Sequence, residues 1–240
     1  MFPRIGMTFA VLLLVAGCAS MPDGPPEPDG VEVQLNGDRI VYRGSMSGEA
    51  IDKVGHLLER ADGRIAWLDI ESGGGEVNWG LDLGNLVHEH GLHVRVIGAG
   101  CHSSCANYVF TAADRRVIEP GAVVSWHGSA LQRRWGFRAR VLMTISSEAR
   151  DYFVQWQQRQ EEFFERIEVD PRVTIVGQDL GCRCTWALSV EDMALFGLTN
   201  IEAPESYTST DLSGFPERYR FRFLDLPEDV FERIRERGDA

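Results

Sequence analysis

Positive charge is scarce in this chain. Its 240 residues include 24 lysines and arginines against 36 aspartates and glutamates, a formal net charge of −12, and Lys53 is the only lysine. A surface that binds nucleic acid needs clustered basic residues, so this balance argues against a nucleic-acid partner. Long apolar runs are also lacking. The apolar run Met7–Ala16 is too short for a bilayer-spanning helix, which needs about 20 such residues.

The N-terminus instead has the pattern of an exported lipoprotein. Leu14–Cys18 (LVAGC) follows the apolar run and resembles a bacterial lipobox, in which cleavage precedes a cysteine that receives the lipid. We therefore expect residues 1–17 to be a signal peptide and Cys18 to be lipidated, with residues 18–30 as a Pro/Gly-rich tether. The residues after the cysteine favour a periplasmic protein anchored to the outer membrane. An ordinary secretory signal with a chance cysteine is the alternative.

Cysteine is sparse too, and four of the five cysteines form two close pairs, Cys101/Cys105 and Cys182/Cys184. An oxidising compartment permits disulfides. A bridge between the pairs is favoured over bridges within them, because a CxC pair is strained. Free thiols and a zinc site are the alternatives, and we expect no metal.

Short apolar runs alternate with amphipathic segments over residues 31–203. This alternation predicts repeated βαβ units, and therefore an α/β domain with a mainly parallel sheet. Residues 204–240 read as a polar linker followed by a small appendage, with a strand and a helix at Phe221–Arg235. The expected strands are Val31–Arg43 (a strand or hairpin), Ile65–Ile70, Leu92–Ile97, Val117–Ile118 and Ala122–Trp126, and the expected helices are Ser47–Arg60, Val77–His90, Ser103–Ala113 and Leu188–Leu198.

A long helical arm is predicted for Phe137–Ile167, which contains no proline or glycine. Apolar residues recur along it near a spacing of 3.5, which is typical of a helix that pairs with another helix. The arm therefore either joins subunits into a homo-oligomer or lies on its own sheet. The residues of this seam are Leu142, Ile145, Ala149, Tyr152, Trp156, Phe163 and Ile167.

Three segments carry residues suited to catalysis, and each follows an expected strand. They are Leu68–Val77 (LDIESGGGEV), Gly98–Cys105 (GAGCHSSC) and Ser125–Gly128 (SWHG). The carboxyl ends of parallel strands meet at one edge of a sheet, so we expect the three to converge. A serine, a histidine and bare glycine amides are the components of acyl-transfer catalysis.

These motifs resemble the Clp protease and crotonase superfamily, specifically its Clp-like serine peptidases. The glycine loop of the family, Asn-Ser-Pro-Gly-Gly, corresponds to Glu71–Gly75, and its serine turn corresponds to Cys101–Cys105. The strand that ends in histidine is Val123–His127, and the late Ser-x-x-Glu-Ala helix is Ser189–Leu198. The resemblance covers roughly Ile65–Ile201 and implies a spiral of ββα and βαβ units.

The resemblance also implies roles for single residues. Ser103 would be the nucleophile, with Ser104 as a rival, and His127 would be the general base. The backbone N–H groups of Gly74 and Ser104 would form the oxyanion hole. The substrate would be a polypeptide, and no cofactor is implied. His102, beside the nucleophile, is expected to line the site.

The chain departs from the family pattern at three positions. Thr185 stands where the family has the acid that orients the histidine, and Asp179 is a nearby carboxylate that competes for this role. Glu71 replaces asparagine and adds a negative charge near the expected oxyanion hole, and Gly73 replaces proline. A Ser–Lys dyad, used by related signal peptide peptidases, is disfavoured because Lys53 lies upstream of the serine.

Two functions follow from these patterns. The first is a periplasmic, lipid-anchored serine peptidase that cleaves unfolded or membrane-derived polypeptides. The second is a catalytically impaired Clp-like scaffold that binds peptides or partner proteins in the envelope. Ser103 with His127 favours the peptidase, whereas Thr185 and Glu71 favour the scaffold.

Overall fold

The computed structural model describes residues 30–133, 135–214 and 221–232. The predicted signal peptide, the lipidated Cys18 and all but the last residue of the tether lie outside these ranges, so these expectations stay predictions. Within the described part, no helix is long and apolar enough to cross a membrane.

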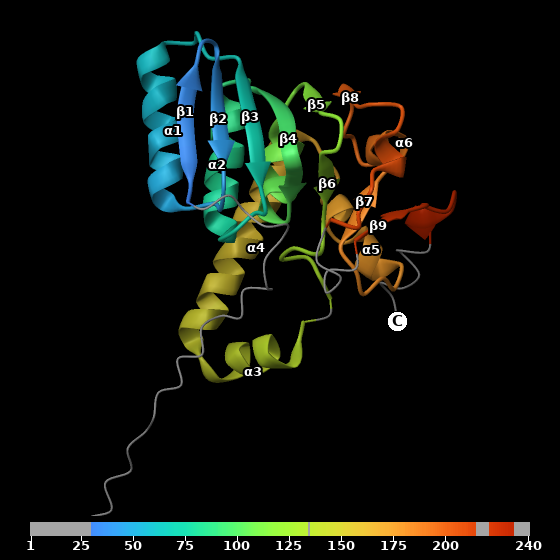
Figure 1. Ribbon diagram of the computed structural model, residues 1–240. Coiled ribbons are helices and arrows are strands. Elements are labelled where there is room, and N and C mark those ends of the chain that lie inside the picture. The colour runs from blue at the N-terminus through green and yellow to red at the C-terminus, as the bar shows by residue number, and fades with distance from the viewer. Residues whose placement is uncertain (1–29, 134, 215–220, 233–240) are drawn as a thin grey trace, which may run out of the picture.

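A seven-stranded, mostly parallel sheet forms the centre of the molecule (Figure 1), which confirms the predicted α/β architecture. Among the described strands of this sheet, only the first two pair antiparallel, and the turn between them is Gly37–Asp38, one residue later than the predicted Asn36–Gly37 turn. The order is β1-β2-β3-β4-β5-β8. Strand β6 pairs with the last residues of β4, after the part of β4 that pairs with β5. The strands are β1 (Glu32–Asn36), β2 (Arg39–Arg43), β3 (Trp67–Ser72), β4 (His93–His102), β5 (Arg116–Ile118), β6 (Val123–Ser125) and β8 (Ile201–Glu202).

Helices cover the sheet and form an arm. The first helix follows its sequence signals, because the Ser47 side chain accepts from the N–H of Ala50 and the apolar face includes Val54 and Leu58. The helices are α1 (Gly48–Ala61), α2 (Val77–Glu89), π-helix η1 (Cys105–Phe110), α3 (Phe137–Ile145), α4 (Ser147–Ile167), α5 (Val176–Asp179) and α6 (Val190–Ala194), with 3₁₀ turns at Pro171–Thr174 and Tyr207–Ser209.

Two predicted helices differ in the structure. The segment Ser103–Ala113 contains a π-helix in place of a regular α-helix, a form that often occurs at functional sites. The segment Leu188–Leu198 is shorter than expected, because Leu188 belongs to strand β7 (Trp186–Leu188). This strand pairs with β9 (Arg222–Leu224), so the C-terminal segment completes a small second sheet.

The predicted single arm helix is broken at Ser146. This residue has an extended backbone, with φ −117° and ψ 123°, and its side chain accepts from the N–H of Ala149. A serine that caps a new helix favours an end to the preceding one, which the absence of proline and glycine did not reveal.

The apolar seam of the arm also divides. Phe163 is buried against the domain's own core, whereas Leu142, Ile145 and Tyr152 are exposed. The buried half of the seam therefore supports the interpretation that the arm lies on the sheet of its own domain. Pairing of subunits through the exposed half stays a prediction.

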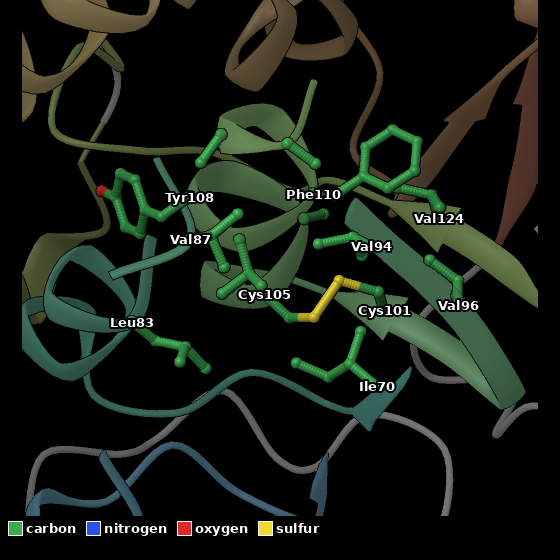
Figure 2. Packing of buried hydrophobic residues seen from close by; sticks show 14 of the residues in the cluster. Ile70, Leu83, Val87, Val94, Val96, Cys101, Cys105, Tyr108, Phe110 and Val124 are labelled. Carbon is green, nitrogen blue, oxygen red and sulfur yellow. A yellow bond between two sulfur atoms is a disulfide. The ribbon is translucent and has the colours of Figure 1, made fainter. Parts of the chain in front are cut away.

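The disulfides join the cysteines within each pair, so the expected bridge between the pairs is wrong. Cys101 bonds to Cys105 and Cys182 bonds to Cys184, with Cα–Cα distances of 5.3 Å in both cases. The two pairs lie in different surroundings. Cys101 and Cys105 are wholly buried among core residues such as Ile70, as Figure 2 shows, whereas the other two cysteines are half-buried on a loop.

Candidate active site

Ser103 occupies a sharp turn between β4 and the π-helix. Its φ of +55° lies in the left-handed region, which non-glycine residues adopt at a cost. The turn is held on both sides: the Ser103 N–H donates to the Ser125 carbonyl at 3.0 Å, and the Ser103 carbonyl accepts from the Asn107 N–H at 2.8 Å. A strained serine between a strand and a helix is the geometry that presents a nucleophile.

The imidazole of His127 meets this serine. His127 Nε2 lies 2.7 Å from Ser103 Oγ, although 24 residues separate them in the chain. With the ring proton on Nδ1, the serine hydroxyl donates to Nε2, which is the arrangement of a nucleophile and its general base. The structure thus brings together the two residues on which the predicted chemistry depends.

Three long-range contacts hold His127. Trp126 forms an antiparallel bridge with Trp186, with both N–H···O distances 2.8 Å. Gln178 Nε2 donates to the His127 carbonyl at 2.7 Å, and Asn107 Nδ2 donates to the carbonyl of Gly128 at 3.0 Å. Neither amide was predicted from the sequence as part of the site. The one sequence signal for either amide was Asn107 itself, a polar residue one turn into the apolar helix that follows the serine.

Burial lowers the pKa of the His127 imidazole below its ordinary 6.5, and a hydrogen bond to its own backbone carbonyl acts in the opposite direction. A lowered pKa keeps the ring neutral at pH 7, and only a neutral ring can accept the serine proton.

The third member of the predicted triad is the weak part of the site. Thr185 lies next to Trp186 in the antiparallel bridge, which sets it opposite His127. Among the described residues, no hydrogen bond joins the Thr185 hydroxyl to the imidazole. The hydrogen bond to Asp170 is the main cause of the raised pKa of Arg172, and the charge of Asp179 adds to it. Thr185 is therefore adjacent to the base without a described bond to its ring.

The predicted oxyanion loop touches the serine turn. A Cβ on Gly74 would lie 2.8 Å from Ser103 Cβ and 3.0 Å from Ser104 N, so the two segments are in direct contact. The Gly74 N–H donates to Ser72 Oγ at 3.1 Å, and so it is engaged within the loop in this structure. The Ser104 N–H opens the helical segment, and no acceptor for it is described among the residues of the structure. Of the two predicted donors, Ser104 is the one positioned for an oxyanion.

The rival nucleophile is not supported by the geometry. The hydroxyl of Ser104 donates to the Gly75 carbonyl at 3.3 Å and its side chain is buried. A hydroxyl that faces a carbonyl has no base to accept its proton, whereas Ser103 faces an imidazole.

We predict that Gly74→Ala slows acylation of Ser103 about 10²–10³-fold, because the added methyl group would displace the Ser104 N–H, and loss of one oxyanion donor has an effect of this size. The new methyl group would displace the serine turn, and φ at Gly74 is +100°. The measurement is the second-order rate constant for labelling by a fluorophosphonate. Gly63→Ala is the matched control, because Gly63 also has positive φ but has open space around it. Equal losses in both variants would contradict the prediction.

The expected unfavourable charge of Glu71 is neutralised. Its carboxylate accepts from Arg43 Nη1 and from the Ala99 N–H, each at 2.8 Å. These contacts join the end of β3 to strands on both sides of it. Glu71 therefore stabilises the strand end that carries the glycine loop.

His102 has a structural role below the serine turn. Its Nδ1 lies 2.6 Å from Ser125 Oγ, and burial lowers the pKa of the ring to about 3. The ring is 2% exposed and packs edge-on against Phe221. The expectation that His102 lines the site is wrong in this respect, because a wholly buried ring cannot contact substrate.

A buried polar network connects α4 to both halves of the site. Gln160 Oε1 accepts from the Tyr108 hydroxyl at 2.7 Å and from the Ala130 N–H at 3.3 Å. Its Nε2 donates to Ser129 Oγ at 3.2 Å. Tyr108 belongs to the helix after the nucleophile, and Ser129 follows the base by two residues. One side chain of the arm thus fixes the distance between the two segments.

A cavity of about 470 Å³ is lined in part by Gln178, whose side chain donates to the backbone carbonyl of His127. Its other walls come from the segment after His127 and from the loop after α5, including Arg133, Trp135 and Arg183. A larger cavity of about 670 Å³ lies on α1, around Lys53 and Arg60. We regard the smaller cavity as the candidate substrate cleft, because Gln178, which donates to the His127 carbonyl, forms part of its wall.

In the described ranges, no three histidine, cysteine, aspartate or glutamate side chains are grouped as metal ligands. No protein-family model and no curated protein matches the chain. The Clp-like resemblance therefore depends on its motifs and on the geometry they form.

Proposed function

We propose that this chain is a Clp-like serine peptidase that hydrolyses peptide bonds through a Ser–His acyl-enzyme mechanism. The observation that carries the proposal is the 2.7 Å contact between Ser103 Oγ and His127 Nε2, made by a serine held in the left-handed region. A helix-capping serine does not need either feature.

The reaction follows from these positions. His127 Nε2 takes the hydroxyl proton as Ser103 Oγ forms a bond to the scissile carbonyl carbon, and the Ser104 N–H donates to the resulting oxyanion. The imidazolium then gives its proton to the leaving amine as the C–N bond breaks, leaving an acyl-enzyme. Water, deprotonated by the same imidazole, releases the acyl group and restores the serine.

We further propose that the peptidase works in the periplasm, anchored by lipid on Cys18. The lipobox-like segment Leu14–Cys18 and the two disulfides both support export to an oxidising compartment. The substrate would be a polypeptide in an unfolded or extended form.

A fluorophosphonate probe tests the activity. We expect wild type and Ser104→Ala to be labelled and Ser103→Ala to remain unlabelled, with the adduct found on the peptide that contains Ser103. Labelling that survives in Ser103→Ala would contradict the proposed nucleophile.

A catalytically impaired scaffold is the second candidate. The observation that favours it is Thr185, an uncharged residue opposite His127 where the family has a carboxylate. Absence of labelling in folded wild type, together with binding of unfolded polypeptide, would support the scaffold and reject the peptidase.

A further inference from the structure

The outward face of α3 is unusually apolar. Four of the ten exposed large apolar side chains among the described residues lie on this helix of nine residues: Phe137 (74% exposed), Val141 (39%), Leu142 (47%) and Ile145 (75%). Contiguous exposed apolar patches on soluble domains mark interaction sites.

The same segment is basic within an acidic protein. No aspartate or glutamate occurs between Glu119 and Glu148, whereas this interval contains four arginines. Two of them, Arg138 and Arg140, belong to α3 itself, and the whole chain has a net charge of −12. Arginines around exposed apolar side chains are typical of helices that lie in the interface of an anionic bilayer.

The position of α3 also favours an anionic bilayer as its partner. The helix lies at the free end of α4, on the side of the sheet where the parallel strands end (Figure 1). Strand β1 begins on that side as well, because Glu32 pairs with Arg43 at the end of β2. The 14 residues from Cys18 to Glu32 span at most about 50 Å. A lipid on Cys18 would therefore hold the domain within about 50 Å of a bilayer, with the tether joined on the side that carries α3.

We propose that α3 docks on the surface of an anionic lipid bilayer. Its apolar side chains enter the boundary between headgroups and acyl chains, and the positive charge of the segment attracts the anionic lipid phosphates. A second copy of the chain fits this face less well, because symmetric pairing would bring two segments without any acidic residue together. The docked domain would present Ser103 toward the bilayer, and this consequence rests on the proposed function.

Vesicle co-sedimentation tests the proposal with the chain from Ala19 onward, which lacks the lipid but keeps every described residue. We expect wild type to sediment with vesicles of phosphatidylcholine and phosphatidylglycerol, and less with phosphatidylcholine alone. Arg138→Gln with Arg140→Gln should lower the partition coefficient about 25-fold, or fivefold per arginine. Phe137→Ser with Ile145→Ser should lower it at least about tenfold.

Matched variants control for charge and apolar area lost elsewhere. Lys53→Gln with Arg60→Gln removes two charges from α1, and Leu35→Ser with Leu195→Ser removes two exposed apolar side chains. Both should bind vesicles as wild type does. Equal losses in control and α3 variants would overturn the proposal, as would no binding by wild type.

Light scattering tests the alternative that a second copy of the chain covers this face of α3. If wild type is an oligomer that Phe137→Ser with Ile145→Ser converts to monomers, the face belongs to a second copy and the proposal is wrong. Fluorophosphonate labelling of each variant keeps the two hypotheses apart, because α3 lies outside the candidate site. Normal labelling of a wild type that does not bind vesicles would reject the docking proposal and leave the proposed function intact.

Discussion

Replacing His127 by alanine is expected to slow acylation of Ser103 about 10³–10⁴-fold, which is the effect of removing a general base from a serine hydrolase. The imidazole is the group described within hydrogen-bond distance of Ser103 Oγ, at 2.7 Å. Without it, the hydroxyl has no acceptor for its proton at the moment of attack. The measurement is the second-order rate constant for fluorophosphonate labelling at pH 7.

The companion variants make this prediction specific. Ser103→Ala combined with His127→Ala should remain unlabelled, as Ser103→Ala does, because the hydroxyl that reacts is absent from both. Thr185→Val should change the rate less than about tenfold, because no described bond joins its hydroxyl to the ring. A loss in Thr185→Val as large as in His127→Ala would show that this threonine orients the base.

The second large effect concerns stability in acid and arises from His102. Burial lowers the pKa of this imidazole from 6.5 to about 3, so in the folded state it stays neutral while the unfolded chain takes up a proton. The unfolded state then binds more protons between these two values, and stability rises with pH across that window. Acidification from pH 6.5 to pH 4 should therefore remove about 3 kcal/mol of unfolding free energy through this one residue.

Denaturant unfolding of wild type and His102→Gln at several pH values measures this effect. The slope of unfolding free energy against pH, and not the absolute stability, carries the information, because the substitution also disturbs the contact with Ser125. We expect a shallower slope between pH 4 and pH 6.5 in His102→Gln. His56→Gln, at an exposed position on α1, controls for the loss of one histidine. Identical slopes in wild type and His102→Gln would contradict the assignment.

Much of the fold was predictable because its signals are local. Apolar runs alternating with amphipathic segments predicted the parallel sheet, and the cap at Ser47 predicted the start of α1. The approach of Ser103 to His127 followed from one further rule, that parallel strands end at the same edge of a sheet.

The disulfide pairing and the roles of two glutamines could not be predicted, because they depend on contacts between distant parts of the chain. The two pairs of cysteines satisfy the same spacing arguments whether Cys101 bonds to Cys105 or to a cysteine on the outer loop, and only the fold decides. Gln160 and Gln178 are polar residues in polar segments, so nothing in the sequence distinguishes them from solvated side chains. Their importance comes from contacts across 31 and 51 residues of chain, which a single sequence does not reveal.

The left-handed turn at Ser103 is a related case. Small residues on both sides predicted a tight turn, and glycine would be the expected residue at positive φ. On the proposed function, a serine occupies this position because its side chain performs the chemistry, and the hydrogen bonds to Ser125 and Asn107 compensate for the strain.

The pH profile of fluorophosphonate labelling tests most directly whether a neutral His127 activates Ser103. The rate constant in wild type should rise through a single ionisation with a pKa below 6.5 and then stay level through pH 8, since burial lowers the pKa of this imidazole. In His127→Ala the step should vanish. A wild-type rate that is flat across this range, or that increases in proportion to hydroxide without a plateau, would show that the serine has no imidazole partner and would contradict the mechanism.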